Sequence, residues 1–296
     1  MTDDQQWTIK RLLTWTTQFL EESGSPSPRL DAEVLLSEAR ECNRIALYTS
    51  YDEVPDEAVL EKFRGWIRQR AGGEPVAYLV GYREFYSLSF SVNRHVLIPR
   101  PETEMLVTLA IDFIKSLAEE NQNSGHPIIC DMGTGSGCIP IAIAANESTC
   151  QLTAVDICPK AIHVAKENSR SHQVGDRIDF IESNLFANVN SDRKFDCIVS
   201  NPPYIGNREK GELPRDVLEH EPHLALFSGE TGLEIIEELI HQSATRLRSG
   251  GQLMFELSPM LSQAGYELIS SHPDFKDSRI VHDLAQLPRV IVATRS

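Results

Sequence analysis

The chain has 296 residues, of which 41% are hydrophobic and 24% charged, so it can bury a core large enough for two soluble domains. Its formal net charge of −15 weighs against a nucleic-acid substrate, because binding such a polyanion depends on lysine and arginine replacing counterions. The sequence shows neither a signal peptide nor an apolar run near the roughly 18 residues of a membrane span, so we expect a cytoplasmic location and no membrane association.

The N-terminal part of the chain has the periodicity of helices. Apolar residues recur on one face over Trp7–Glu22 and over Leu30–Ala39. A third helix begins at Pro55 and ends at Gly72-Gly73. We expect a small helical bundle here, followed by short strands or a hairpin over residues 82–98, where the apolar period changes.

From about residue 127 the sequence alternates apolar strands and helices, after a helix over Glu102–Leu117. Such alternation predicts a parallel, doubly wound α/β sheet. The pair Gly250-Gly251 predicts a tight turn before the fifth strand. The expected strands are Pro127–Asp131, Gln151–Asp156, Asp179–Glu182, Cys197–Ser200, Gln252–Glu256 and Arg289–Ala293, and the main helices between them are Gly137–Ala145, Pro159–Ser169 and Leu233–Leu247.

A glycine-rich loop, Asp131-Met132-Gly133-Thr134-Gly135-Ser136-Gly137, joins the first of these strands to a helix. Glycine lets the backbone turn sharply and approach a ligand, and the unpaired amides of a helix start can bind a carboxylate or hydroxyl. The loop lacks the third glycine of the dinucleotide fingerprint, which Cys138 replaces, and it is not a P-loop. An ordinary tight turn is the alternative. The candidate cofactor-binding residues are Gly133, Thr134, Gly135, Ser136 and Gly137.

An acidic residue, Asp156, closes the next apolar strand, 19 residues after Gly137 (156 − 137). Ligands of open α/β sheets bind beyond the carboxyl ends of the strands, where an acidic side chain can hydrogen-bond both hydroxyls of a ribose. An aspartate here can equally cap the following helix. Together with the glycine loop, Asp156 favours a nucleoside-containing cofactor.

The most specific motif, Asn201-Pro202-Pro203-Tyr204, directly follows the strand that ends at Ser200. The prolines fix their own φ and hold the preceding residues extended, which can point the Asn201 side-chain oxygen and the Pro202 carbonyl into a cleft. A rigid turn is the plainer interpretation of two prolines. The position of this pair after the fourth strand of a nucleotide-type sheet favours a site.

Two fixed carbonyl groups suit methyl transfer to a planar amide or arylamine nitrogen, whose delocalised lone pair is a poor nucleophile. They can hold both N–H groups, orient the lone pair toward a sulfonium methyl and stabilise the positive charge that grows on nitrogen. We therefore expect Asn201 and Pro202 to be catalytic, and Pro203 and Tyr204 to bind substrate, with Tyr204 packed on its planar group.

These residues closely resemble those of the release factor glutamine N5-methyltransferase family, the HemK/PrmC type. The resemblance runs from about residue 28 to the C-terminus. Beyond the Asn-Pro-Pro-Tyr motif it rests on Glu74–Gly81 with the following YREFY, on Leu97–Glu104, and on the pairs Glu221-Pro222, Ala225-Leu226 and Gly232-Leu233.

The resemblance implies a helical substrate-binding domain (1–81), a β-hairpin linker (82–98) and a catalytic domain (99–296) with the seven-stranded, mostly parallel sheet of Rossmann-like class I methyltransferases. The implied methyl donor is S-adenosyl-L-methionine, which becomes S-adenosyl-L-homocysteine. The implied partner is a class 1 peptide chain release factor, methylated on the glutamine of its Gly-Gly-Gln loop. We expect a monomer with no direct nucleic-acid partner.

Further site residues follow from the same resemblance. Asn184, Leu185 and Asn201 would join the glycine loop and Asp156 at the cofactor, while Arg100 and Glu102 would lie beside its methionine end and the substrate entrance. Two departures stand out. The family usually has an acidic residue, often followed by Trp or Leu, where this chain has Asn184-Leu185, and a Glu-Ile-Gly run where it has Glu256-Leu257-Ser258.

No metal site is expected. None of the six cysteines forms a C-x-x-C pair, so buried thiols in a reducing compartment are the simplest interpretation. His220 and His223 could suggest metal ligands, but Pro222 lies between them and no third ligand is evident.

Three alternatives remain open from the sequence. The Asn-Pro-Pro-Tyr motif alone would also suit N6-adenine methylation of DNA or RNA, which favours basic and aromatic surfaces. A glutamine of a ribosomal protein could be the acceptor with the same catalytic residues. A non-catalytic binding module is disfavoured by the intact Asn201 and glycine loop.

Overall fold

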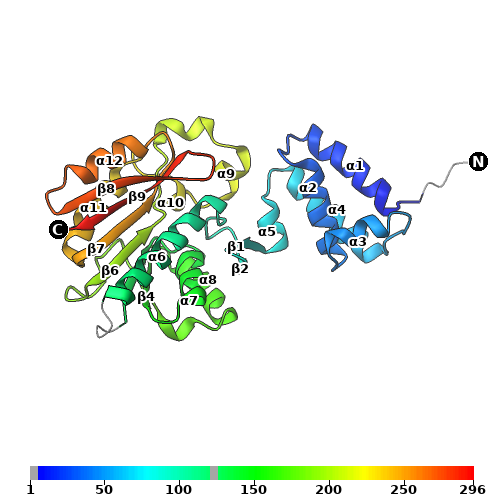
Figure 1. Ribbon diagram of the computed structural model, residues 1–296. Helices are drawn as coiled ribbons and strands as arrows, with labels where there is room; N and C mark the ends of the chain where they lie inside the picture. Colours follow the sequence, from blue (N-terminus) through cyan, green and yellow to red (C-terminus); the bar gives the residue numbers. More distant parts are fainter. Residues whose placement is uncertain (1–5, 121–125) are drawn as a thin grey trace, which may run out of the picture. The chain divides into compact units, whose positions relative to one another are not determined.

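The computed structural model describes residues 6–120 and 126–296, and the chain divides into two compact units (Figure 1). The helical unit comprises the chain up to Tyr82 together with Pro214–His220. The sheet unit comprises Arg83–Leu213 and Glu221–Ser296. The short segment 214–220, which follows the Asn-Pro-Pro-Tyr motif, is therefore a part of the helical unit, an assignment that no local sequence pattern predicts.

The helical unit is built around a single apolar core contributed mainly by its longer helices. Side chains start its helices: Asp56, for example, accepts a hydrogen bond from the Val59 amide at 2.9 Å. Pro28 stands in the first turn of a helix, where its missing N–H costs nothing. The helices are α1 (Ile9–Glu22), α2 (Pro28–Ala39), α3 (Arg44–Thr49), α4 (Glu57–Ala71), α5 (Val76–Val80) and α9 (Arg215–His220).

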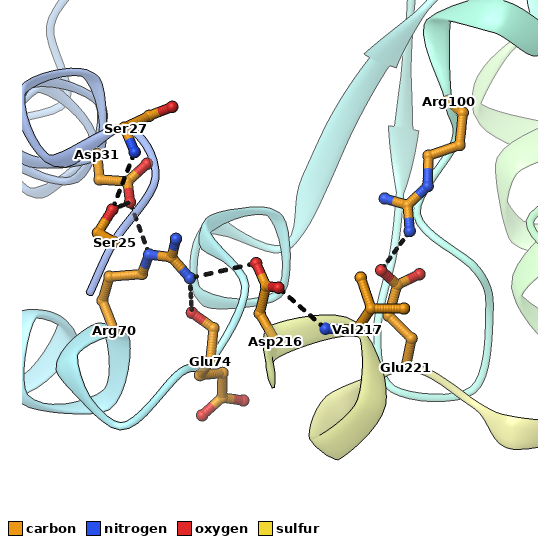
Figure 2. A network of polar contacts seen from close by, with 9 residues as sticks. All are labelled: Ser25, Ser27, Asp31, Arg70, Glu74, Arg100, Asp216, Val217 and Glu221. Atoms are coloured by element: carbon orange, nitrogen blue, oxygen red, sulfur yellow. Dashed lines mark hydrogen bonds and ion pairs between the residues drawn. The ribbon is translucent and has the colours of Figure 1, made fainter. Parts of the chain in front are cut away.

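A buried arginine, Arg70 of α4, connects three segments of the helical unit (Figure 2). Its Nε donates to the Asp31 carboxylate at 2.7 Å and its Nη1 to the Glu74 carbonyl at 3.3 Å. The same Nη1 lies 3.7 Å from the Asp216 carboxylate of α9. Because the Arg70 side chain is only 6% exposed, these contacts are shielded from water. Arg70 thus anchors segment 214–220 to the helical unit.

A β-hairpin with a two-residue turn follows the last of the N-terminal helices. Strands β1 (Tyr82–Phe85) and β2 (Leu88–Ser91) form a two-stranded sheet. Tyr86 and Ser87 between them have φ values of 50° and 61°, as type I′ turns require, and that turn matches the twist of paired strands. The predicted hairpin connector is confirmed.

The sheet unit contains seven strands in the order β5-β4-β3-β6-β7-β9-β8. Strands β3 to β7 run parallel to one another, whereas β9 is antiparallel to both β7 and β8. The predicted mostly parallel sheet is confirmed. The strands are β3 (Ile128–Met132), β4 (Gln151–Asp156), β5 (Ile178–Glu182), β6 (Phe195–Ser200), β7 (Leu247–Glu256), β8 (Phe275–His282) and β9 (Pro288–Arg295).

One predicted turn is wrong. Gly250-Gly251 lies inside β7 rather than before it. The pairing with β6 shifts there, from Phe195 opposite Leu247 to Cys197 opposite Gln252. Gly250 takes a φ of 81°, so the pair forms an irregularity within the strand that glycine accommodates.

Apolar side chains alternate along the strands and fill a core on each face of the sheet. Along β9, Val290 and Val292 join the core that contains α6 and α7, while Ile291 and Ala293 join the core that contains α11 and α12. Because successive side chains point to opposite faces of the sheet, both faces are apolar, and a layer of helices packs on each of them. The helices are α6 (Glu104–Glu120), α7 (Cys138–Asn146), α8 (Pro159–Ser171), α10 (His223–Leu226), α11 (Glu234–Arg246) and α12 (Ser262–Ser270), with 3₁₀ turns η1 (Pro101–Thr103), η2 (Gly175–Arg177) and η3 (Asn207–Glu212).

Across residues 6–120 and 126–296, no helix is both long enough and apolar enough to cross a membrane.

Candidate active site

A cavity of about 650 Å³ opens in the sheet unit where β3, β4 and β6 end. Adjacent parallel strands place their carboxyl ends at one edge of the sheet, and β3 lies between β4 and β6. The volume of the cavity is within the range of small-molecule binding sites. The wall combines the segment before η1, the glycine loop, the ends of β4 and β5, the Asn-Pro-Pro segment and the start of α11.

The glycine loop has the left-handed backbone that its sequence predicts. Gly133, Gly135 and Gly137 have φ values of 81°, 55° and 79°. A side chain on Gly137 would come within 2.9 Å of Ile141 and 3.0 Å of Ala165, so this glycine permits close helix packing. Gly133, Thr134, Gly135 and Ser136 line the cavity, whereas Gly137 does not.

Asp156 lines the cavity and also orders the loops around it. One carboxylate oxygen accepts from the Gly135 amide and the other from the Cys158 amide, each at 2.8 Å. Burial raises the pKa of Asp156, and these backbone N–H groups act in the opposite direction. The N-cap residue of α8 is Cys158, and no side chain caps this helix, so the alternative that Asp156 is a helix cap is wrong. The bond to the Cys158 amide instead holds the chain just before α8.

Replacing Asp156 with alanine should weaken binding of S-adenosyl-L-methionine about 10- to 100-fold. The change removes a charged acceptor and frees the amides of the loop that it orders, and hydrogen bonds to charged groups contribute about 1.5–3 kcal/mol each. Calorimetric titration would measure the dissociation constant. The same change at exposed Asp176, which does not line the cavity, should leave it unaltered. Equal affinities for both variants would contradict the assignment.

Several buried polar atoms of the glycine loop have no hydrogen-bond partner. Neither carboxylate oxygen of fully buried Asp131 has a hydrogen-bond partner among the described residues, and the same holds for the hydroxyls of Thr134 and Ser136. Buried polar groups normally have partners, so their lack is a signal of a polar ligand. A nucleoside with an amino-acid end, such as S-adenosyl-L-methionine, supplies amines and hydroxyls that fit such groups. The residues present therefore fit the implied cofactor.

Burial raises the pKa of Asp131 from 3.8 to about 7, and the neighbouring Asp156 charge adds to the shift. As pH rises, this carboxyl therefore ionises at a lower pH in the unfolded chain than in the folded protein. Its contribution to stability is therefore complete below about pH 4 and is lost as pH rises to about 7.

The pH dependence of stability provides a test. Between about pH 4 and 7 the unfolding free energy of the free enzyme should fall by up to about 1.4 kcal/mol per pH unit at this residue. Glu256, whose pKa burial raises to about 7, titrates in the same window, so the informative quantity is the difference between wild type and Asp131→Asn. Urea unfolding followed by circular dichroism should show that difference changing with pH. A constant difference would refute the shifted pKa.

The Asn-Pro-Pro segment also lines the cavity. Asn201, Pro202 and Pro203 all contribute to the wall. The Asn201 side-chain nitrogen donates to the Thr103 hydroxyl at 3.0 Å. Just before it, the Ser200 hydroxyl donates to the Met132 carbonyl at 2.7 Å and joins the ends of β6 and β3. The glycine loop and the Asn-Pro-Pro segment therefore face the same space.

Tyr204 does not line the cavity. Its ring packs against the core that contains α11 and α12, and burial raises its pKa to about 12. Its packing on a substrate stays a prediction.

In the segment before α6, likewise, one of the two predicted site residues lines the cavity and the other does not. Arg100 lines the cavity and pairs with buried Glu221 (Figure 2). Glu221 also accepts a hydrogen bond from the Ile98 amide at 3.2 Å. Glu102 does not line the cavity and lies 4.0 Å from Arg289. Glu221, for which the sequence predicts no role beyond the resemblance, thus fixes both the Ile98 backbone and the Arg100 side chain at the cavity wall.

At the end of β5, Asn184 and Leu185 both line the cavity. Leu185 has a φ of 48°, an uncommon conformation for a residue other than glycine. Sequence reasoning missed other polar groups around the site, namely Thr103 and Asn168. Buried Asn168 of α8 donates to the carbonyls of Ser91 and Ser136 and so braces the glycine loop, but nothing in the local pattern of α8 marks it.

Within the described part of the chain, no group of three or more His, Cys, Asp and Glu side chains could hold a metal ion.

Comparison with known proteins adds independent findings. The family model of the PrmC N-terminal domain matches residues 11–81, and that of the methyltransferase small domain matches residues 113–224. The release factor glutamine methyltransferase of Rhodopirellula baltica is 48% identical over 98% of this chain and 97% of its own length. The protein of the same name from Leptospira interrogans is 37% identical over 97% of this chain and 98% of its own.

Solved structures support the fold. The hMettl16 catalytic domain in complex with MAT2A 3′UTR hairpin 6 has a TM-score of 0.55 at 19% identity, covering 74% of this chain and 80% of that one. At such identity the likeness concerns the fold alone. The near full-length match to the Rhodopirellula and Leptospira proteins goes further, and with it the resemblance read from the motifs is confirmed: the chain belongs to the release factor glutamine methyltransferase family.

Proposed function

We propose that this enzyme transfers a methyl group from S-adenosyl-L-methionine to N5 of the glutamine in the Gly-Gly-Gln loop of class 1 peptide chain release factors, and so supports translation termination. The observation that carries the proposal is the cavity in which Asn201 and Pro202 share a wall with the glycine loop and Asp156. The near full-length identity to release factor glutamine methyltransferases supports the acceptor.

When bound, S-adenosyl-L-methionine supplies an electrophilic methyl group on a positively charged sulfur. Asp156 and the Gly133–Ser136 loop, which line the cavity, would hold the nucleoside and amino-acid ends, and Leu185 would cover the adenine. Asn201 Oδ1 and the Pro202 carbonyl accept the two N–H groups of the glutamine amide and orient its nitrogen toward the methyl. Transfer would form a new N–C bond and break the S–C bond, one N–H proton would leave to solvent, and S-adenosyl-L-homocysteine would be the co-product.

The Asn-Pro-Pro residues accelerate this step in two ways. Alignment of nitrogen and methyl removes much of the entropic barrier. Two fixed carbonyl dipoles stabilise the positive charge that appears on the amide nitrogen in the transition state. A strong base is not required, because the methylated, cationic nitrogen is acidic.

We assign the helical unit to binding of the release factor, in line with its match to the PrmC N-terminal domain. The proposal includes a monomeric enzyme that acts in the cytoplasm. Light scattering at working concentration would reveal a dimer if the first of these is wrong.

Mass spectrometry of the release factor tests the acceptor. After incubation with enzyme and S-adenosyl-L-methionine, the peptide with the Gly-Gly-Gln loop should gain one methyl on its glutamine. A release factor with alanine in place of that glutamine should gain none. Methylation of adenine in DNA or RNA, or of a ribosomal protein alone, would reject the proposal.

A further inference from the structure

The exposed apolar side chains of the sheet unit all lie at one edge of its sheet. Single exposed leucines are normal on a soluble protein, but there is no general reason for them to gather in one place. Here each lies in a segment that follows the carboxyl end of β4, β6 or β7, or in the turn that leads into β9, which starts at that same edge because it is antiparallel to β7. The cavity opens at this edge. Among the described residues of the sheet unit, the exposed large apolar side chains are Ile157, Leu224, Met260, Leu284 and Leu287.

Three of these side chains lie outside the cavity. Ile157 and Leu224 line it, so a ligand in the cavity would contact them. Met260, Leu284 and Leu287, which we call the apolar rim, do not line it. Strand β9 lies two strands from β6 in the sheet (Figure 1), and neighbouring strands are about 4.8 Å apart, so the rim lies on the order of 10 Å from the end of β6. Neither the cofactor nor a glutamine side chain in the cavity would cover the rim.

The turn that carries Leu284 has a fixed backbone. The Asp283 carboxylate accepts from the amides of Ala285 and Leu287, each at 2.9 Å. It also accepts from Arg289 Nε at 2.9 Å, and the Asp283 amide donates to the Leu287 carbonyl at 2.8 Å. The Leu284 side chain is nevertheless fully exposed, at 105%, so the turn does not hold it in the core. Because the backbone is already ordered, a partner that covers Leu284 loses little affinity to ordering the turn.

Met260 lies beside this turn, on the loop between β7 and α12. At the start of the loop, the Leu257 amide donates to the Arg289 carbonyl at 2.8 Å. At its end, the Ser262 hydroxyl lies 3.5 Å from the Pro288 carbonyl. Both ends of the loop are therefore held against the first residues of β9, which directly follow the turn. The Met260 side chain is 73% exposed, and the flexible, polarizable side chain of methionine adapts readily to an apolar partner surface.

We propose that the apolar rim is a docking surface for the release factor, which would cover it with apolar side chains of the folded domain that carries the Gly-Gly-Gln loop. This inference rests on the proposed function. The occupant follows from position, because a folded protein that delivers a glutamine into the cavity must lie over the edge at which the cavity opens, and the rim continues that edge. Apolar side chains fit a protein surface, whereas binding a nucleic acid depends on lysine and arginine.

Matched variants of Leu284 test this surface, because a fully exposed side chain can be changed without disturbing the core. Leu284→Gln removes the apolar character at similar size and should raise KM for the release factor about tenfold or more. Loss of binding that is uniform along the reaction leaves kcat unchanged, and affinity for S-adenosyl-L-methionine should also stay the same. Leu284→Met keeps the apolar surface and should behave as wild type. Equal KM values for the Gln and Met variants would overturn the proposal.

Photo-cross-linking identifies the occupant without relying on turnover. With the photoreactive residue p-benzoylphenylalanine in place of Leu284, the enzyme should cross-link to the release factor domain that carries the Gly-Gly-Gln loop. Cross-linking only to a second copy of the enzyme would show a dimer interface and overturn the proposal. Methylation by the wild type is measured in the same series. Cross-linking without methylation would refute the proposed function, and methylation without cross-linking would refute the docking surface.

Discussion

Replacing Asn201 with alanine should lower kcat for methylation of the release factor by about 10²–10³-fold, the effect of removing one preorganised polar group from a transition state. The Asn201 oxygen interacts most strongly with the amide nitrogen when that nitrogen is becoming cationic, so the loss should appear in kcat more than in KM. Transfer of a labelled methyl group to purified release factor under saturating substrate measures it directly.

A control for this change lies on the same loop. Asn207 at the start of η3 is exposed and does not line the cavity, so Asn207→Ala should keep wild-type turnover. Affinity for S-adenosyl-L-methionine should change less than about tenfold in Asn201→Ala, because Asp156 and the glycine loop remain. If Asn201→Ala turned over within a few-fold of Asn207→Ala, the catalytic role of Asn201 would be wrong.

Replacing Arg70 with alanine should destabilise the helical unit by about 3–5 kcal/mol, because it leaves the buried Asp31 carboxylate with the Ser25 hydroxyl but without its cationic partner. The Asp31 side chain is 10% exposed, and Arg70 is the cation that it contacts at 2.7 Å. The Glu74 carbonyl and Asp216 would lose the same donor. Segment 214–220 would then lose its anchor to the helical unit.

The tryptophans make this measurement specific. All three in the chain, Trp7, Trp15 and Trp66, belong to the helical unit, so their fluorescence during urea unfolding reports on that unit. Arg64→Ala removes a pair with Glu57 in which both side chains are at least 49% exposed, and should cost less than about 1 kcal/mol. Equal shifts for the two variants would show that the buried arrangement of Arg70 contributes nothing special.

The elements that carry the proposed cofactor site could be predicted from the sequence because their signals are local. The predicted strand Gln151–Asp156 is observed with identical bounds, since an apolar run closed by an acidic residue needs no distant partner to be recognised. The three glycines take left-handed backbone angles that other residues avoid, so the sequence of the loop already specifies its shape. The Asn-Pro-Pro-Tyr motif could be placed at a strand end for the same reason.

Elements that are defined by contacts between distant residues could not be predicted from the sequence. The strand Phe275–His282 forms the sheet edge and alternates weakly, with one buried residue, so its pairing with β9 defines it rather than its own pattern. The short helices α3 and α5 have too few residues to show a period. Segment 214–220 belongs to the helical unit through Asp216 and Arg70, which lie far apart in the chain.

The sequence by itself determined the fold class, the family and the residues that we propose bear the chemistry, because strand periodicity, glycine backbone angles and proline rigidity are properties of neighbouring residues. Only the tertiary structure decided which of those residues share a cavity wall: Asn201 does, while Tyr204, Gly137 and Glu102 do not. It also brought Thr103 within hydrogen-bond distance of Asn201, 98 residues away along the chain. Hydrogen bonds of that kind depend on how strands are ordered in the sheet, which no local pattern encodes.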